Sequence, residues 1–147
     1  MIIWMGVIFM MSHLDGAKSW YLTGEFLTVT KTGSLDNEST YDEKMKSYDE
    51  DDSWNQMVFL RKLAHFTEYL VLAILLMNAL LFRMSWKESV KWTLLIGIAY
   101  AIFDEVHQLF IPGRSGNVID MMIDSLGVVM GLFCVVWIIK VRKAKIH

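Results

Sequence analysis

Three long apolar segments, each interrupted by charged residues, constrain the fold of this chain more than any other feature. They cover residues 58–82, 90–111 and 118–139. A helix needs about 20 mainly apolar residues to cross a bilayer, because its backbone must form all of its hydrogen bonds internally. Each segment therefore predicts a transmembrane helix. The turns around residues 83–87 and 111–116 are short and polar, so consecutive helices are expected to be antiparallel.

The N-terminal part of the chain is expected to add a short helix and a long loop. Residues 1–12 are apolar but, at ~1.5 Å per residue, cover about half of a hydrocarbon core. Residues 13–57 hold ten Asp and Glu against four Lys, which predicts an acidic outer loop, with a short strand or interfacial segment at 20–30. The expected fold is a single all-α membrane domain, an antiparallel bundle of four transmembrane helices at about 1–12, 58–82, 90–111 and 118–139, with a basic tail at 140–147.

The distribution of Lys and Arg predicts the orientation of these helices. Basic residues gather in the turn at 83–91 and in the tail at 140–147, and such clusters mark the cytoplasmic side of a membrane protein. Both termini are therefore expected in the bacterial cytoplasm, with residues 13–57 and 112–116 outside. Arg61, Lys62 and Arg114 would then lie on the outer side against the rule, which suggests that partners or a ligand hold them.

Composition excludes several classes of function. The net charge of −2 disfavours nucleic acid as a partner. Cys134 is the single cysteine and lies in an apolar run, so disulfide frameworks and cysteine-based zinc sites are excluded. The 54% share of hydrophobic residues is high for a soluble domain and fits the three apolar segments.

Polar residues inside the predicted spans are the candidates for function. A charged side chain at the centre of a span costs about 2.5–3.5 kcal/mol on insertion scales, so such residues usually face a bundle interior or a cavity. His65, Asp104 and Asp124 each lie about 8–12 Å from the outer helix ends at ~1.5 Å per residue. We therefore expect a polar pocket that opens outward and is closed on the cytoplasmic side. Its predicted ligand-binding residues are Lys62, His65, Glu68, Tyr69, Gln108, Arg114, Asp120 and Asp124.

Small residues favour this inward placement of the aspartates. Gly127 and Gly131 continue the helical face that carries Asp120 and Asp124, and a small-xxx-small pattern lets helices approach closely. The sequence therefore predicts that the aspartates on this helix face other helices rather than lipid.

The ordered set of motifs resembles the VanZ-like family of small bacterial membrane proteins. The matching motifs are Lys62-x-x-His65-Phe66-x-Glu68-Tyr69, Asp104-Glu105-x-His107-Gln108, Pro112-Gly113-Arg114, and Asp120 with Gly127. The resemblance implies a four-helix protein of the cell envelope, whose namesake is associated with resistance to teicoplanin-type glycopeptides. Two departures are Asp124, where the family more often has Asn, and the short first helix.

Three functions remain open from the sequence. In the first, the pocket binds a lipid-linked cell-wall precursor or an anionic lipid, with Lys62 and Arg114 holding phosphate. In the second, the protein is a membrane hydrolase or transferase whose catalytic residues are Glu105, Asp104 and His107. A divalent cation is a possible cofactor, with His65, Asp104 and Asp120 as candidate ligands. In the third, the polar network only fixes the packing of a structural subunit of an envelope complex.

Overall fold

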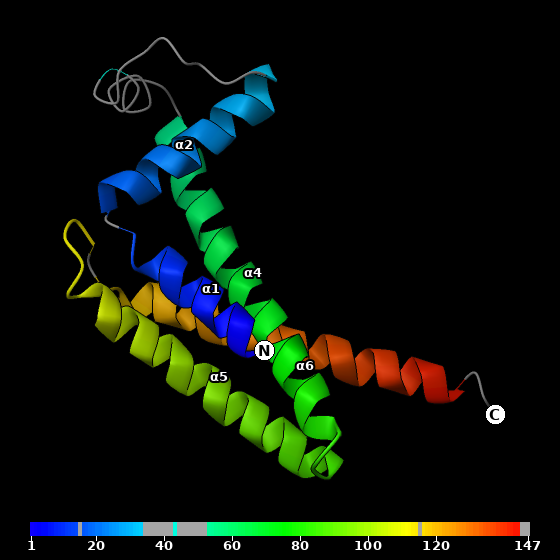
Figure 1. The fold of residues 1–147 in the computed structure, drawn as a ribbon. Helices are drawn as coiled ribbons and strands as arrows, with labels where there is room; N and C mark the ends of the chain where they lie inside the picture. Colours follow the sequence, from blue (N-terminus) through cyan, green and yellow to red (C-terminus); the bar gives the residue numbers. More distant parts are fainter. Residues whose placement is uncertain (15, 34–42, 44–52, 115, 145–147) are drawn as a thin grey trace.

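The computed structural model describes residues 1–14, 16–33, 43, 53–114 and 116–144. These described ranges form helices and short connections without a strand (Figure 1), which confirms the predicted all-α class. The helices are α1 (Ile2–Ser12), α2 (Gly16–Thr32), α4 (Ser53–Leu81), α5 (Trp86–Gln108) and α6 (Val118–Ala144).

The segment predicted as a loop with a short strand is in part a helix. Residues 16–32 form α2, which crosses and contacts the N-terminal part of α4 (Figure 1). Over so few residues, an alternating pattern and a helical pattern are hard to separate. Leu22, Phe26 and Val29 recur at the spacing of one helical face, and Thr23 and Thr28 donate hydrogen bonds to carbonyls four residues earlier. The acidic residues predicted as a solvated loop lie mostly outside the described residues.

The helices differ in whether their length and apolar composition suit a membrane span. Within the described residues, Trp54–Leu81 in α4 and Val118–Arg142 in α6 are long and apolar enough to do so, and α1 is a shorter apolar helix. Helix α5 does not meet the same criterion, although residues 90–111 were predicted as a span. Its charged side chains occur near both ends, at Lys87, Glu88 and Lys91 and at Asp104 and Glu105.

The close packing of α6 against α4 forms the centre of the fold. A Cβ atom at Gly127 would overlap the carbonyl oxygen of Phe66, and one at Gly131 would overlap that of Leu70. Helix α4 makes its most extensive contacts with α6, and α5 packs against both. The predicted small-residue contact is confirmed, and it turns the Asp124 face of α6 toward the other helices.

Helix α1 is fixed to this core by hydrogen bonds from two aromatic side chains. Trp4 Nε1 donates to the carbonyl oxygen of Glu68 at 2.9 Å, and Tyr100 Oη donates to that of Met5 at 2.7 Å. Ile8, also on α1, is fully buried in the core, against which Trp4 and Tyr100 pack. The short first helix therefore covers one side of the α4 and α5 pair.

The turn between α5 and α6 approaches the start of α2 very closely. Gly113 has a positive φ of 71°, and Gly16 donates its N–H to the Pro112 carbonyl at 3.1 Å. A side chain at Gly16 would overlap the Gly113 carbonyl, so glycine permits this approach. As a result, Arg114 lies next to both α1 and α2.

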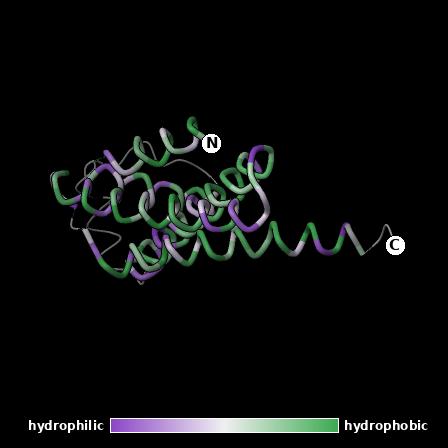
Figure 2. The backbone as a smooth tube through the Cα atoms, turned by 90° about the horizontal axis from the view of Figure 1, so that it is seen from below, coloured by the Kyte–Doolittle hydropathy of each residue, from purple (hydrophilic) through white to green (hydrophobic). Residues whose placement is uncertain are grey.

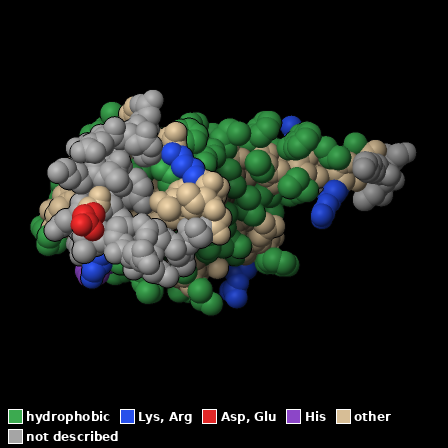
Figure 3. Space-filling view, turned by 90° about the horizontal axis from the view of Figure 1, so that it is seen from above, with side chains coloured by type: hydrophobic (Ala, Val, Ile, Leu, Met, Phe, Trp, Pro, Cys, Tyr) green, Lys and Arg blue, Asp and Glu red, His purple; other side chains and the backbone are tan. Residues whose placement is uncertain are grey.

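Hydrophobic side chains cover much of the outer surface of the helices. The C-terminal part of α6 extends beyond the other helices and is largely hydrophobic along its length (Figures 1 and 2). Phe133 and Trp137 on this helix are 60% and 61% exposed. The view from above also shows many apolar side chains on the surface (Figure 3). Exposed apolar surface of this extent fits contact with lipid rather than with water.

Candidate functional site

Four titratable side chains from three helices converge on the side of the bundle where α5 ends and α6 begins. His65 comes from α4, Asp104 and Glu105 from α5, and Asp124 from α6. One nitrogen or oxygen atom from each of them lies within 4.8 Å of those of the other three. The three carboxylates are 2%, 6% and 0% exposed in that order. We call these residues the four-residue cluster.

Some oxygens of the four-residue cluster have partners that fix the side chains. Glu105 Oε2 accepts a hydrogen bond from the Asn117 backbone N–H at 2.8 Å, and Gln108 donates to Asp104 Oδ2 at 3.1 Å. His65 Nδ1 lies 3.4 Å from Asp124 Oδ1. Among the described residues, Glu105 Oε1 and both Asp124 oxygens lack a hydrogen-bond partner. Several buried acceptors therefore remain available.

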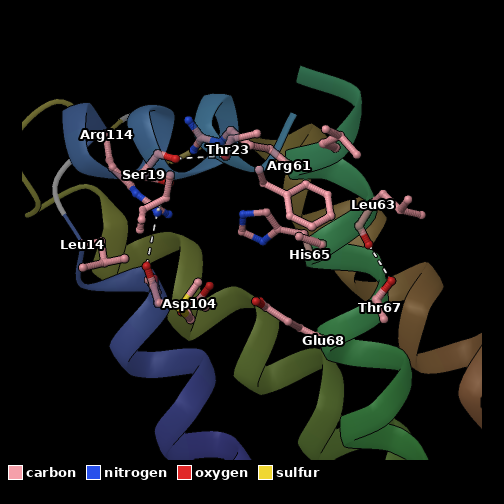
Figure 4. A pocket seen from close by; sticks show the side chains of 16 residues that line it. Leu14, Ser19, Thr23, Arg61, Leu63, His65, Thr67, Glu68, Asp104 and Arg114 are labelled. Atoms are coloured by element: carbon pink, nitrogen blue, oxygen red, sulfur yellow. Dashed lines mark hydrogen bonds between the residues drawn. The ribbon is translucent and has the colours of Figure 1, made fainter. Parts of the chain in front are cut away.

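A cavity of about 490 Å³ lies beside the cluster, between α1, α2 and α4. Its wall is mainly apolar, and its polar side chains come from more than one side, with Arg61, Arg114 and Ser19 above the His65 ring and Asp104 and Glu68 below it (Figure 4). In this view the His65 ring lies between Arg61 and Glu68, with Asp104 and Arg114 facing it from the opposite wall. The cavity thus combines apolar walls with a region that holds both signs of charge.

A second, smaller cavity of about 230 Å³ shares Arg61, His65 and Arg114 with the first. It is lined by Trp20 and Trp54, whose rings stack at 4.6 Å between centroids. The two arginines therefore stand between an apolar cavity and a more polar one.

The two arginines are held in different ways. Arg114 Nη2 donates to the Met11 carbonyl at 3.2 Å and to Ser19 Oγ at 3.0 Å, while its buried Nε has no partner among the described residues. The Arg61 guanidinium lies 4.2 Å from the centroid of the Trp20 ring. Burial lowers the pKa of Arg114 from its ordinary value, against the opposing effect of nearby carboxylates, yet guanidinium stays charged in proteins.

Comparison with known proteins assigns the chain to a family. The VanZ/LLP1 family model matches residues 1–140 of the 147. The chain belongs to the VanZ/LLP1 family. No curated protein and no solved structure shows significant similarity to it. Together with the two apolar helices, membership of VanZ/LLP1 indicates a membrane protein.

In this VanZ/LLP1 protein, most of the predicted site residues lie in or around the cavities. His65, Glu68, Asp104 and Arg114 line the larger one, and Lys62, Gln108 and Asp120 line the smaller one. Lys62 Nζ lies 3.5 Å from Asp120 Oδ1. Asp120 was predicted as a metal ligand with His65 and Asp104, but the structure groups Glu105 and Asp124 with those two instead.

Two predicted residues are placed elsewhere. Tyr69, predicted to bind a ligand, is fully buried in the apolar core, where its hydroxyl lies 3.4 Å from the Tyr100 carbonyl oxygen. His107, predicted as catalytic, stacks on Phe9 at 4.7 Å and lies 3.3 Å from the His13 ring. It is outside the four-residue cluster, although it follows Asp104 by three residues on α5 and projects only about 60° from it.

Other residues of the site were not among the predicted ligand-binding residues. Arg61 was expected only to be held by a partner or a ligand. Arg61, His65 and Glu68 are spaced i, i+4 and i+7, so helical periodicity could have placed Arg61 in the cavity. Ser19 and Trp20 lie on α2, and no pattern within the sequence indicates that α2 folds back over α4. Their roles depend on tertiary contacts alone.

Proposed function

We propose that this protein binds the phosphate-bearing head group of a membrane lipid or lipid-linked cell-wall precursor. The observation that carries this proposal is the cavity of about 490 Å³ with mainly apolar walls that two arginines, Arg61 and Arg114, also line. Phosphate would lie between the arginines, and acyl or isoprenyl chains would lie along the apolar wall. An amphiphile matches this division, whereas a fully polar solute would leave the apolar wall unfilled.

The free hydrogen-bonding capacity of Arg114 supports a phosphate ligand. Its buried Nε has no partner within the described structure, and a buried donor without a partner costs about 1–3 kcal/mol. Phosphate oxygens accept two parallel hydrogen bonds from a guanidinium group, which a lysine cannot offer. Leu22, Phe26 and Leu63 supply the apolar side of the same cavity.

The binding test compares two arginines with different positions. We expect Arg114→Gln to weaken the affinity for a fluorescent phosphatidylglycerol about tenfold or more, because a hydrogen bond to a charged group contributes about 1.5–3 kcal/mol. Arg83→Gln is the matched control, since Arg83 is exposed in the turn after α4. Binding would be measured by fluorescence anisotropy on the purified protein in neutral detergent. Equal affinities of both variants and the unchanged protein would refute the proposed site.

The proposal includes a membrane topology. Helices α1, α4, α5 and α6 would be embedded in the membrane, with both termini in the cytoplasm and the cavity near the outer surface. The basic residues that flank α5 and α6 at 83–91 and 140–147 support this orientation. Helix α2 would then lie over the outer ends of the other helices.

Single cysteines in the two turns test this topology. In a Cys134→Ser background, we expect Phe110→Cys to react with a membrane-impermeant maleimide on intact cells. Met84→Cys should react only after the membrane is permeabilised. Both side chains are exposed, at 79% and 40%, so accessibility within the protein is not limiting. The reverse labelling pattern would overturn the orientation.

A hydrolase or transferase is the second candidate, because Glu68 and Asp104 line the same cavity as the arginines. Glu105→Gln separates the two functions. If the protein only binds the lipid, Glu105→Gln keeps the lipid affinity, and neither the variant nor the unchanged protein converts the lipid to a product. An enzyme would convert the lipid, and the conversion would stop in the variant.

Teicoplanin tolerance of cells that express the protein would test the resistance that the family resemblance implies.

A further inference from the structure

We propose that the four-residue cluster, His65, Asp104, Glu105 and Asp124, binds one divalent transition-metal ion. This site is separate from the phosphate-binding role of Arg61 and Arg114. It would join α4, α5 and α6 through a common ion at the inner wall of the cavity.

The geometry of the donor atoms fits a single ion. Metal-to-ligand bonds to imidazole nitrogen and carboxylate oxygen are about 2.0–2.2 Å, so donor atoms on opposite sides of an ion lie about 4.0–4.4 Å apart. The donor atoms of the cluster lie within 4.8 Å of one another. Side-chain movements of about 0.4 Å bring the donor atoms to bonding distance. Three different helices supply the donors, so the site depends on the folded protein.

Buried oxygens without partners are the independent sign of a ligand. Asp124 is 0% exposed; its Oδ1 lies 3.4 Å from His65 Nδ1, and its Oδ2 has no partner within the described residues. Glu105 is 6% exposed, and its Oε1 also lacks a partner. Buried charges are normally paired or coordinate metals, because an isolated carboxylate loses its hydration without compensation. A divalent cation would supply the missing partner for both side chains.

The surroundings of the cluster match those of a metal site. Ligands in such sites are usually oriented by hydrogen bonds from a second layer of residues. Here Gln108 donates to Asp104, and the Asn117 backbone N–H donates to Glu105, each leaving the second carboxylate oxygen for an ion. Carboxylates favour Mn²⁺ among other hard cations, and imidazole favours Zn²⁺ and iron, so a set of three carboxylates and one imidazole indicates a transition metal.

The test uses Mn²⁺ alone, added to the full-length protein after chelator treatment in neutral detergent. We expect one bound ion per chain, measured by electron paramagnetic resonance of the free Mn²⁺ that remains. Asp124→Asn should weaken binding at least tenfold. Glu88→Gln is the matched control, because Glu88 is an exposed carboxylate at the opposite end of α5 from the cluster and glutamine can keep the capping box with Ser85. Its affinity should stay within twofold of that of the unchanged protein.

Two results would overturn the proposal. One is the absence of stoichiometric binding by both Mn²⁺ and Zn²⁺ to protein that elutes as a single species on size exclusion. The other is an equal loss of affinity in Glu88→Gln and Asp124→Asn, which would indicate nonspecific attraction to acidic side chains. If Asp124→Asn does not fold, Glu105→Gln provides the same comparison. No lipid is added, so failure of metal binding leaves the lipid-binding proposal unaffected.

Discussion

Individual charged residues of both signs surround one region of this protein. The carboxylates of Asp104, Glu105 and Asp124 are buried between helices, whereas Arg61 and Arg114 line the cavities beside them. Burial of this many charges rarely contributes to stability, because desolvation offsets the attraction within each pair. Their concentration therefore favours a binding role over a purely structural one.

Tyr69 shows how burial changes the role expected of a residue. Its hydroxyl lies 3.4 Å from the Tyr100 carbonyl oxygen, which is a long hydrogen bond, and its ring is fully buried. We expect Tyr69→Phe to change the free energy of unfolding by about 1 kcal/mol or less. Tyr69→Ala should cost about 3–5 kcal/mol, because it leaves a cavity in the core. Unfolding by sodium dodecyl sulfate in mixed micelles measures both.

The same variants test whether Tyr69 takes part in binding. Tyr69→Phe should bind the fluorescent lipid as the unchanged protein does. A loss of lipid binding in this variant, at unchanged stability, would restore the ligand-binding role that its position in the sequence suggests.

At the scale of helices, glycine determines how closely α6 approaches α4. A methyl group at Gly127 would meet the Phe66 carbonyl oxygen, part of the backbone of α4, which cannot move aside as a flexible side chain can. We expect Gly127→Ala to destabilise the protein by about 1–3 kcal/mol, as overpacking typically does. Gly6→Ala is the control, because nothing lies within 4 Å of a Cβ atom there. Both would be measured by the same detergent unfolding.

Displacement of α6 by Gly127→Ala would also change the candidate site. Asp124 lies one turn before Gly127 on α6, so a displaced α6 would also separate Asp124 from His65. Equal stability of Gly127→Ala and Gly6→Ala would show that the helices do not pack as closely as described.

The sequence predicted the elements with strong apolar patterns and missed the one without. The helices around residues 58–82 and 118–139 were evident because long apolar runs have few alternatives. Helix α2 was not, since residues 16–32 are of mixed polarity and their helix is fixed by contacts with α4. The same cause explains why Ser19 and Trp20 were not predicted as parts of the site.

The spacing of polar residues along the helices indicated which of them share a depth, but it did not indicate how each helix is rotated against its neighbours. His65, Asp104 and Asp124 were expected at one depth, and the structure brings them together with Glu105. His107 is three residues from Asp104, but the helix turns it toward Phe9 and His13. Residues three apart on a helix project about 60° from each other. That difference is enough for their side chains to contact different neighbouring helices.

At the scale of the whole molecule, we expect this membrane protein of the VanZ/LLP1 family to bind an anionic amphiphile. In the proposed topology, the apolar surface would face lipid and α2 would cover the outer end of the cavity, to which the α5–α6 turn supplies Arg114. A lipid that enters such a cavity from the bilayer would keep its apolar chains out of water.

The mass of whatever remains bound to the purified protein tests this account most directly. Native mass spectrometry of protein extracted in mild detergent should show one lipid per chain, and fragmentation of that lipid should release a phosphate-bearing head group. The same measurement on Arg114→Gln should show a marked loss of the bound species. Protein that is folded and free of lipid, or that retains only neutral lipid equally in both forms, would contradict the central claim.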